Sequence, residues 1–302
     1  MLALGTDNPD VRFMNAVRPY ISPIAFRELL EAAAGWKVAR VPISPRAAIA
    51  VVPLLRRHGV AVAVSEHRFV HEPDQGKGGW SNRLARVVED DADVGDVYVY
   101  AAQDERLIIV AADAEADGDN NLFGEILAIP ACCRAAFARH LELVRAHQND
   151  PIHTTIAGTI TAPPHGPWNN IAAQYFGRCL LSYAPCSLDC EASTERARLA
   201  HALLEQVDRN EARAFLDAHR CSYVFSDRQG VHRLDTFRIE DGVLRFNGVT
   251  STVDGPLRRR LIAADGLKAS SLCSFEMLSR LEVVDAIEDS ARLALFWCGD
   301  DH

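Results

Sequence analysis

The sequence predicts an α/β fold that becomes α+β towards the C-terminus, with a mixed sheet and a helical middle segment that carries cysteines. Three patterns predict it. Helical and strand-like stretches alternate in the first part, helical periodicity dominates the middle, and short β-rich stretches separated by turn residues fill the last part. The 302 residues suffice for one large domain or two modest ones. We expect an α/β N-terminal domain (1–115), a helical cysteine-bearing segment (116–220) and an α+β C-terminal part packed on the rest (221–302).

Helix starts are well marked in the first part of the chain. Ser22 and Ser44 each stand directly before a proline, a combination typical of the first residues of a helix, and Gly35 and Gly59 end the two helices. Short connections join these helices to apolar, strand-like stretches, which predicts a βαβ unit with parallel pairing. The expected elements are helices 23–34 and 45–57, strands 37–43 and 60–69, and a hairpin of strands 94–101 and 106–111.

The apolar spacing is mainly helical from Leu122 onwards and becomes strand-like from Ser222. The triplet Glu240-Asp241-Gly242 predicts the turn of a hairpin. The loop that ends in the prolines before Trp168 is expected to hold at most one short strand. The expected helices are 122–128, 130–147, 168–178, 188–207 and 210–219, and the expected strands are 154–161, 179–183, 222–226, 231–239 and 243–246.

The composition is that of a soluble globular protein, with 48% hydrophobic and 24% charged residues. The net charge of −9 argues against general nucleic-acid binding, which depends on an excess of Lys and Arg. The longest apolar run, 47–55, is far too short to cross a membrane, and residues 1–7 do not resemble a signal peptide. We therefore expect a cytoplasmic protein whose partner is a small molecule, without nucleic acid or membrane.

Two close pairs of cysteines are the most informative feature of the chain. The pairs are Cys132 with Cys133 and Cys186 with Cys190, and each pair follows a proline that is expected to begin a helix. The N-terminal end of a helix stabilises anions, including thiolates. Together the two pairs predict a four-thiolate metal site. The remaining cysteines are expected to be small buried hydrophobic residues: Cys179, Cys221, Cys273 and Cys298.

The spacing of the cysteines bears on the identity of the metal. Structural zinc sites typically use two C-x₂₋₄-C pairs, whereas Cys132 and Cys133 are adjacent. Adjacent residues of a helix diverge by about 100°, yet both can reach a cluster whose irons are spread over several ångströms. We therefore rank a [4Fe–4S] cluster first. Zinc is the alternative, and reduced cysteines packed at helix starts are the third interpretation.

The cysteine pattern resembles that of an uncharacterised prokaryotic family of unknown function. The pattern is P-x-C-C followed about fifty residues later by P-C-S-x-x-C-x-x-S, and the resemblance covers residues 122–200. The family's first motif has Gly-Tyr where this chain has Ala128-Ile129. The resemblance implies a shared cysteine site without implying a reaction. The matching residues are Pro130, Cys132, Cys133, Phe137, Pro185, Cys186, Ser187, Cys190 and Ser193.

Two other segments contain candidate functional residues. A glycine-rich loop follows a predicted buried strand, and its Lys77, Gly78 and Gly79 are candidates for binding a phosphate or carboxylate of a cofactor; a plain surface loop is the alternative. His67, at the end of the same strand, is a candidate acid or base.

The long segment between the cysteine pairs contains His153 and the stretch from His165 to Asn169. Loops of this length are often functional, so we select His165 and Asn169 as catalytic candidates, with a plain helix N-cap as the alternative for Asn169.

These observations predict a metalloprotein with a four-cysteine [4Fe–4S] cluster, leaning towards an enzyme that acts on a small molecule by Lewis-acid, sulfur-transfer or redox chemistry. The alternative is a zinc-stabilised binding protein without catalysis.

Overall fold

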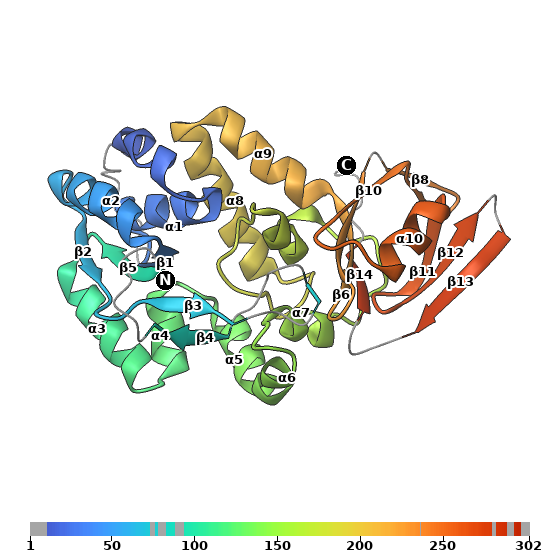
Figure 1. Cartoon of the computed structure of the whole chain (residues 1–302), viewed down its shortest axis with the longest axis horizontal. Helices are drawn as coiled ribbons and strands as arrows, with labels where there is room; N and C mark the ends of the chain where they lie inside the picture. Colours follow the sequence, from blue (N-terminus) through green and yellow to red (C-terminus); the bar gives the residue numbers. More distant parts are fainter. Residues whose placement is uncertain are drawn as a thin grey trace. The chain divides into compact units, whose positions relative to one another are not determined.

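The computed structural model describes residues 11–72, 76–77, 83–87, 94–235, 237–279, 282–288 and 293–296 (Figure 1). Contacts divide the chain into two units. Unit 1 comprises Met1–His71, Leu84–Ala135 and Arg198–Arg213, and unit 2 comprises Glu72–Arg83, Ala136–Ala197 and Ala214–His302. The expected three-part division of the sequence is a different partition and stays a prediction.

The sheet of unit 1 consists of β1 (Ala39–Ile43), β5 (Val97–Ala102) and β2 (Ala61–Val64), in that order. The strand β5 pairs antiparallel with both neighbours. The expected parallel pairing of the first two strands is therefore wrong, because β5, which is nearly buried along its whole length, takes the central position between them.

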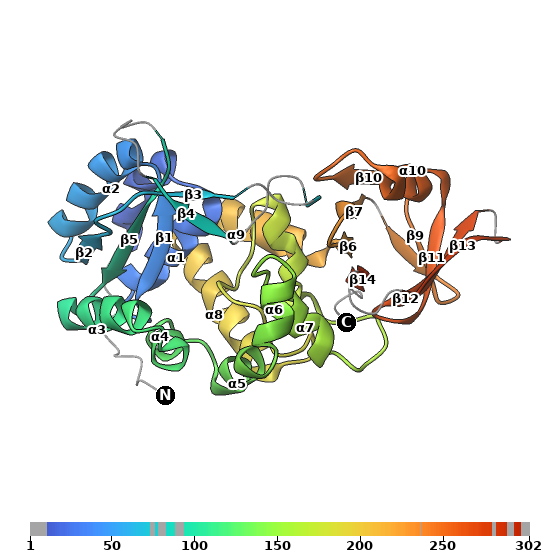
Figure 2. The ribbon, with the colours of Figure 1, turned by 60° about the horizontal axis from the view of Figure 1, so that its bottom comes forward.

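Helices cover both faces of this sheet. In Figures 1 and 2, α1 (Pro23–Ala33) and α2 (Pro45–Arg57) lie on one side, and α3 (Glu105–Ala116) and α4 (Asn120–Ile126) on the other. The expected Ser-Pro helix starts are confirmed, since each serine hydroxyl accepts a 3.2 Å hydrogen bond from the backbone N–H three residues later.

The expected hairpin of 94–101 and 106–111 is wrong, because its second strand is part of helix α3. The Asp104 side chain caps this helix by accepting a 2.9 Å hydrogen bond from the Arg106 N–H. The expected strand 60–69 is interrupted: after β2 the chain turns and continues as β3 (Phe69–His71), which pairs with β4 (Leu84–Arg86).

The middle of the chain is helical, as expected, but its elements are shorter. The expected helix 130–147 is broken at His140, and the expected helix 168–178 consists of two 3-10 helices. The expected strand 154–161 is wrong, because most of it belongs to helix α7, and 179–183 forms no strand. The elements are α5 (Ala131–Arg139), α6 (Leu141–Ala146), α7 (Ile152–Gly158), η3 (Pro167–Asn169), η4 (Ile171–Phe176), α8 (Glu191–Val207) and α9 (Arg209–Arg220).

The C-terminal part of unit 2 contains two antiparallel sheets, in the orders β10-β7-β6-β14 and β13-β12-β11-β9-β8. Leu257 and Leu261 of helix α10 (Pro256–Ala263) pack into a core with Val224 and Phe275 from the sheets. The strands are β6 (Ser222–Ser226), β7 (Gly230–Asp235), β8 (Arg238–Glu240), β9 (Val243–Arg245), β10 (Gly248–Ser251), β11 (Gly266–Ser271), β12 (Ser274–Ser279), β13 (Glu282–Glu288) and β14 (Leu293–Phe296).

The expected turn between β8 and β9 is confirmed: Asp241 and Gly242 have φ angles of 52° and 74°, as a two-residue hairpin turn requires. The chain thus has the mixed α/β composition that the sequence predicts, with its strands in several small antiparallel sheets.

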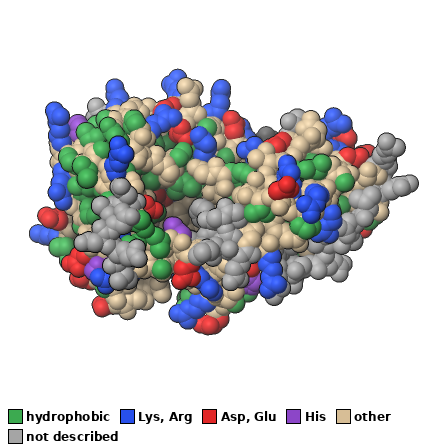
Figure 3. Space-filling view, in the orientation of Figure 1, with side chains coloured by type: hydrophobic (Ala, Val, Ile, Leu, Met, Phe, Trp, Pro, Cys, Tyr) green, Lys and Arg blue, Asp and Glu red, His purple; other side chains and the backbone are tan. Residues whose placement is uncertain are grey.

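Within the described residues, no helix combines the length and apolar character needed to span a bilayer. On the face seen in Figure 3, Lys and Arg side chains are interspersed with Asp and Glu.

Candidate metal centre

The first cysteine pair lies in the first turn of α5. The Pro130 carbonyl accepts hydrogen bonds from the N–H groups of Cys133, at 2.9 Å, and Arg134, at 3.0 Å, so the helix begins directly after this proline, as the sequence predicts. Cys133 is buried and Cys132 is exposed, yet their Sγ atoms are only 3.9 Å apart. Although the two residues are adjacent, both sulfur atoms can therefore reach the same metal ion.

The second pair lies in the loop that precedes α8, which we call the cysteine loop (185–190). Cys190 is buried and directly precedes the helix: its carbonyl accepts a 2.9 Å hydrogen bond from the Thr194 N–H, and its own N–H donates to the Ser187 carbonyl at 3.3 Å. Cys186 is half-buried, at the start of this turn. The loop therefore folds back on itself and holds both cysteines close to one helix end.

Helix α7 and the residue after it hold the cysteine loop in place. The Thr155 hydroxyl donates a 2.7 Å hydrogen bond to the Pro185 carbonyl, and the Thr159 hydroxyl accepts one from the Leu188 N–H at 3.0 Å. Gly158 allows the closest approach, because a Cβ atom at this position would lie 1.8 Å from the Cys186 carbonyl oxygen. The helix and the loop therefore fit together only with glycine here.

Asn169 also holds the cysteine loop through hydrogen bonds. Its Nδ2 donates to the carbonyls of Leu188 and Cys190, both at 2.9 Å, and contacts the Thr194 hydroxyl at 3.1 Å. Its Oδ1 is buried and has no hydrogen bond within the described residues. The described contacts of Asn169 are thus those of a residue that positions the loop, and its expected catalytic role stays a prediction.

His165 also lies against the cysteine loop. Its Nδ1 is 3.4 Å from an oxygen of Asp189, and its Nε2 is buried without a hydrogen bond within the described part of the chain. Burial lowers the pKa of His165, and the charge of Asp189 offsets part of that effect. The described partner of His165 is therefore a carboxylate of the protein itself, and the expected catalytic role of this histidine stays a prediction.

The four sulfur atoms of Cys132, Cys133, Cys186 and Cys190 all lie within 4.8 Å of one another. Four thiolates at this spacing can hold a metal ion.

The remaining predicted residues have different surroundings. His67 is half-buried in the turn after β2, where its carbonyl accepts a hydrogen bond from the Ser65 hydroxyl at 2.8 Å. Gly78 and Gly79 lie outside the described residues. Lys77 is fully buried, and its ammonium group lies 2.7 Å from a carboxylate oxygen of Asp150. Lys77 thus contacts a carboxylate of the protein itself, and its role towards a cofactor stays a prediction.

Lys77 belongs to a second buried group of polar residues that the sequence analysis missed. Its Nζ is also 3.5 Å from Asp227, which is 2.8 Å from His147 and 3.5 Å from His153. Burial alone would raise the pKa of Asp227, but the nearby imidazoles of His153 and His147 and the charge of Lys77 outweigh it and hold that pKa well below its usual value. The sequence signal that could have indicated this group is the pair His147 and His153 on either side of the Asp150-Pro151 helix start.

Comparisons of the chain with protein-family models, with curated proteins and with solved structures found no match. The resemblance of the cysteine pattern to an uncharacterised family therefore stays a prediction.

Proposed function

We propose that this protein is a metalloprotein whose Cys132, Cys133, Cys186 and Cys190 ligate one metal centre. The observation that carries the proposal is the gathering of the four sulfur atoms within 4.8 Å. The contacts of the cysteine loop support it, because a loop held by Thr155 and Asn169 presents its thiolates in a fixed arrangement before the metal arrives.

The separation of the first two sulfur atoms supports a single tetrahedral ion, which makes zinc the better candidate. Two thiolates that each lie 2.3 Å from a tetrahedral zinc ion are about 3.8 Å apart. The corresponding distance between the sulfur atoms of Cys132 and Cys133 is 3.9 Å. Four cysteine ligands leave no open coordination position on a zinc ion, so zinc here would stabilise the fold. This is the zinc-stabilised protein that the sequence analysis gives as its alternative.

A [4Fe–4S] cluster, the first choice from the sequence, is the second candidate. The adjacency of Cys132 and Cys133 departs from the usual zinc spacing and favours it. The exposure of Cys132 gives a small molecule access to one side of the centre. When bound, such a cluster would supply Lewis-acid, sulfur-transfer or redox chemistry for an enzyme acting on a small molecule.

Metal analysis and a visible spectrum of anaerobically purified protein distinguish the candidates. About one zinc per chain in colourless protein supports the zinc centre, and brown protein containing iron and sulfide supports the cluster. The substitution Cys186→Ser removes a proposed ligand and is expected to abolish most of the metal content. Cys221→Ser is the matched control, since this half-buried cysteine lies outside the group. Wild-type protein that folds without metal would overturn both candidates.

A further inference from the structure

Three side chains from separate elements of unit 2 converge on one buried point. His147 directly follows α6, His153 lies in the first turn of α7, and Asp227 begins the turn between β6 and β7. One ligand atom from each lies within 4.8 Å of the other two. The imidazole rings stack with centroids 3.9 Å apart, and Phe225 packs against the edge of the His153 ring. The group is therefore closely packed on the side of β6.

Two atoms of this group face each other without a hydrogen bond. His153 is 1% exposed; its Nε2 and Oδ1 of Asp227 are both buried and make no hydrogen bond within the described residues. A buried polar atom without a partner costs about 1–3 kcal/mol, so such atoms usually have one. Their separation of 3.5 Å is long for a hydrogen bond. It is close to the roughly 3.4 Å between two ligand atoms at 2.1 Å from one tetrahedral ion.

The surrounding charges favour a cation at this point. The ammonium group of Lys77 pairs with Asp150, whose carboxylate also accepts a 2.6 Å hydrogen bond from the Tyr175 hydroxyl. The same ammonium group lies 3.5 Å from Oδ1 of Asp227, so its one positive charge faces the two negative charges of Asp150 and Asp227. The carboxylates therefore leave one net negative charge beside two imidazoles, which bind metal ions in their neutral form.

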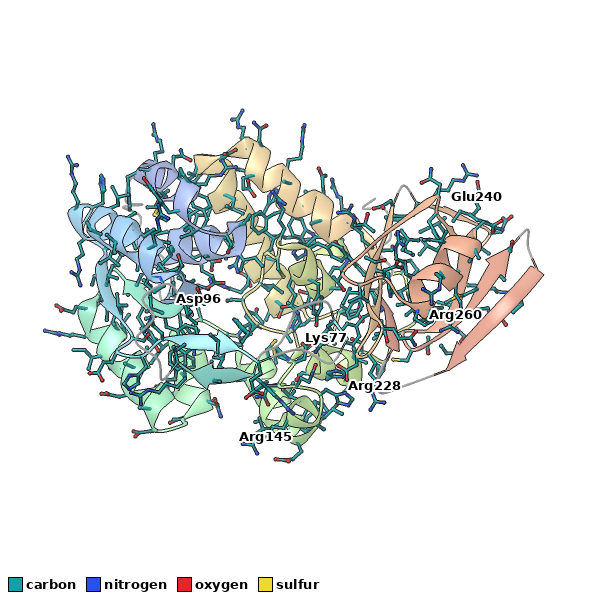
Figure 4. The ribbon with its side chains drawn as sticks, in the orientation of Figure 1. Lys77, Asp96, Arg145, Arg228, Glu240 and Arg260 are labelled. Atoms are coloured by element: carbon teal, nitrogen blue, oxygen red, sulfur yellow. The ribbon has the colours of Figure 1, made fainter. Side chains whose placement is uncertain are left out.

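The backbone shows that this arrangement is built into the fold. Gly76, at φ +133°, lies so close to Arg228 that a Cβ atom would be 2.2 Å from the Arg228 carbonyl oxygen. This close approach sets Lys77 beside Asp227, and Figure 4 shows Lys77 next to Arg228. Gln148 and Asn149, in the loop between the two histidines, also both adopt positive φ angles, 62° and 57°.

We propose that His147, His153 and Asp227 form a second metal site, separate from the cysteine centre, for a divalent transition-metal ion such as Zn²⁺ or Fe²⁺. Two imidazoles and one carboxylate are the donor set that these ions accept, and three protein ligands leave coordination positions open. A proton shared between His147 and Asp227 is the competing explanation, but it satisfies only the pair at 2.8 Å and leaves His153 Nε2 and Asp227 Oδ1 facing each other.

Cobalt(II) is the probe that tests the site. It is added to protein that carries its cysteine-bound metal as purified, and binding is followed by calorimetry and by X-ray absorption at the cobalt edge. The variants are Asp227→Asn and His153→Gln. The control is His201→Gln, a histidine of α8 that pairs with Glu205 and lies outside the group. Because each change keeps the side chain similar in size, thermal melting of every variant shows whether it remains folded.

The wild-type protein and the control are expected to bind one cobalt ion per chain through nitrogen and oxygen atoms. Asp227→Asn and His153→Gln are expected to weaken that binding at least about 100-fold, since loss of residues that only orient ligands already costs 10–100-fold. Equal binding by the wild type and a folded Asp227→Asn protein would overturn the proposal. Should the variants not fold, a cobalt spectrum of the wild type with sulfur as the nearest neighbour would do the same.

The outcome is separable from that of the cysteine centre. In a Cys132→Ser protein the His–Asp group is intact, so cobalt binding through nitrogen and oxygen is expected to persist when the sulfur-bound metal is lost. Loss of both kinds of binding in that variant would contradict the proposed independence.

Discussion

The substitution Thr155→Val tests how strongly α7 supports the candidate cysteine centre, and the neighbouring Thr154→Val is its matched control. Both threonines are fully buried in the same helix. The Thr155 hydroxyl donates to the Pro185 carbonyl at 2.7 Å, whereas the Thr154 hydroxyl has no hydrogen-bond partner within the described residues. The two variants therefore make the same chemical change in two different hydrogen-bonding environments.

The two substitutions are expected to change the free energy of unfolding differently. Thr155→Val removes a donor from a buried carbonyl, which lowers the free energy of unfolding by about 1–3 kcal/mol. Thr154→Val replaces a buried, unsatisfied hydroxyl by a methyl group, so it is expected to leave the stability unchanged or to raise it by up to about 1 kcal/mol. Because the lost bond positions the cysteine loop, Thr155→Val is also expected to weaken metal binding by about 10–100-fold.

Urea unfolding followed by circular dichroism measures the stability difference, and competition with a chromophoric chelator measures the metal affinity. The Thr155→Val protein is expected to be the less stable and the weaker metal binder of the pair. Equal destabilisation by both changes would show that packing of the helix, rather than the hydrogen bond to the cysteine loop, determines the effect.

Three further predictions concern single substitutions at other residues. Burial alone would raise the pKa of Glu28, but the charges of Arg27 and Lys37 outweigh it and lower that pKa from 4.5 to about 2. The substitution Glu28→Gln should therefore lower the free energy of unfolding by about 3 kcal/mol at pH 7. In urea unfolding, the difference between the wild type and this variant should vanish as the pH falls from about 4.5 towards 2. Gly158→Ala should displace the cysteine loop and reduce the measured metal content several-fold, unlike Gly166→Ala, where nothing lies within 4 Å. Gly76→Ala should lower the melting temperature by several degrees in calorimetry, since its Cβ would collide with a backbone carbonyl.

The parts of the fold that the sequence predicted have local causes. A serine before a proline caps a helix with its own hydroxyl, and an Asp-Gly pair forms a hairpin turn through its own backbone, so α1, α2 and the β8–β9 turn need no distant contacts. The strand expected at 106–111 is wrong because the apolar residues there follow the period of a helix and not the alternation of a strand. In α3, Ile108, Ala111 and Ala114 are buried at intervals of three, while Ile109 is 58% exposed.

The strand expected at 154–161 is wrong for a different reason. Its β-branched residues favour strands, yet the Asp150 side chain accepts a 3.1 Å hydrogen bond from the Ile152 N–H and starts a helix there. Tertiary contacts then keep the helix, because the Thr155 and Thr159 hydroxyls bond to the cysteine loop. A strand preference of a few residues is weaker than a capped helix packed on its neighbour.

The two candidate sites differ in how far the sequence reveals them. Each cysteine pair is local, and its position after a proline is visible without the fold. The His–Asp group has no such local pattern, because Asp227 lies 80 residues beyond His147 and meets it only through the turn between β6 and β7. Lys77 was selected for its glycine-rich loop, but its buried partner Asp150 could not be inferred without knowing which segments pack together.

Helix α7 contributes to both candidate sites, which determines how independent they can be. His153 and Thr155 are two residues apart, so their side chains point in directions about 200° apart around the helix, one towards Asp227 and the other towards the cysteine loop. The Asp150 cap at its start fixes the helix separately from the loop. Thr155→Val should therefore weaken the cysteine centre without changing the cobalt affinity of the His–Asp group; a parallel loss at both sites would mean that α7 moves as one body and couples them.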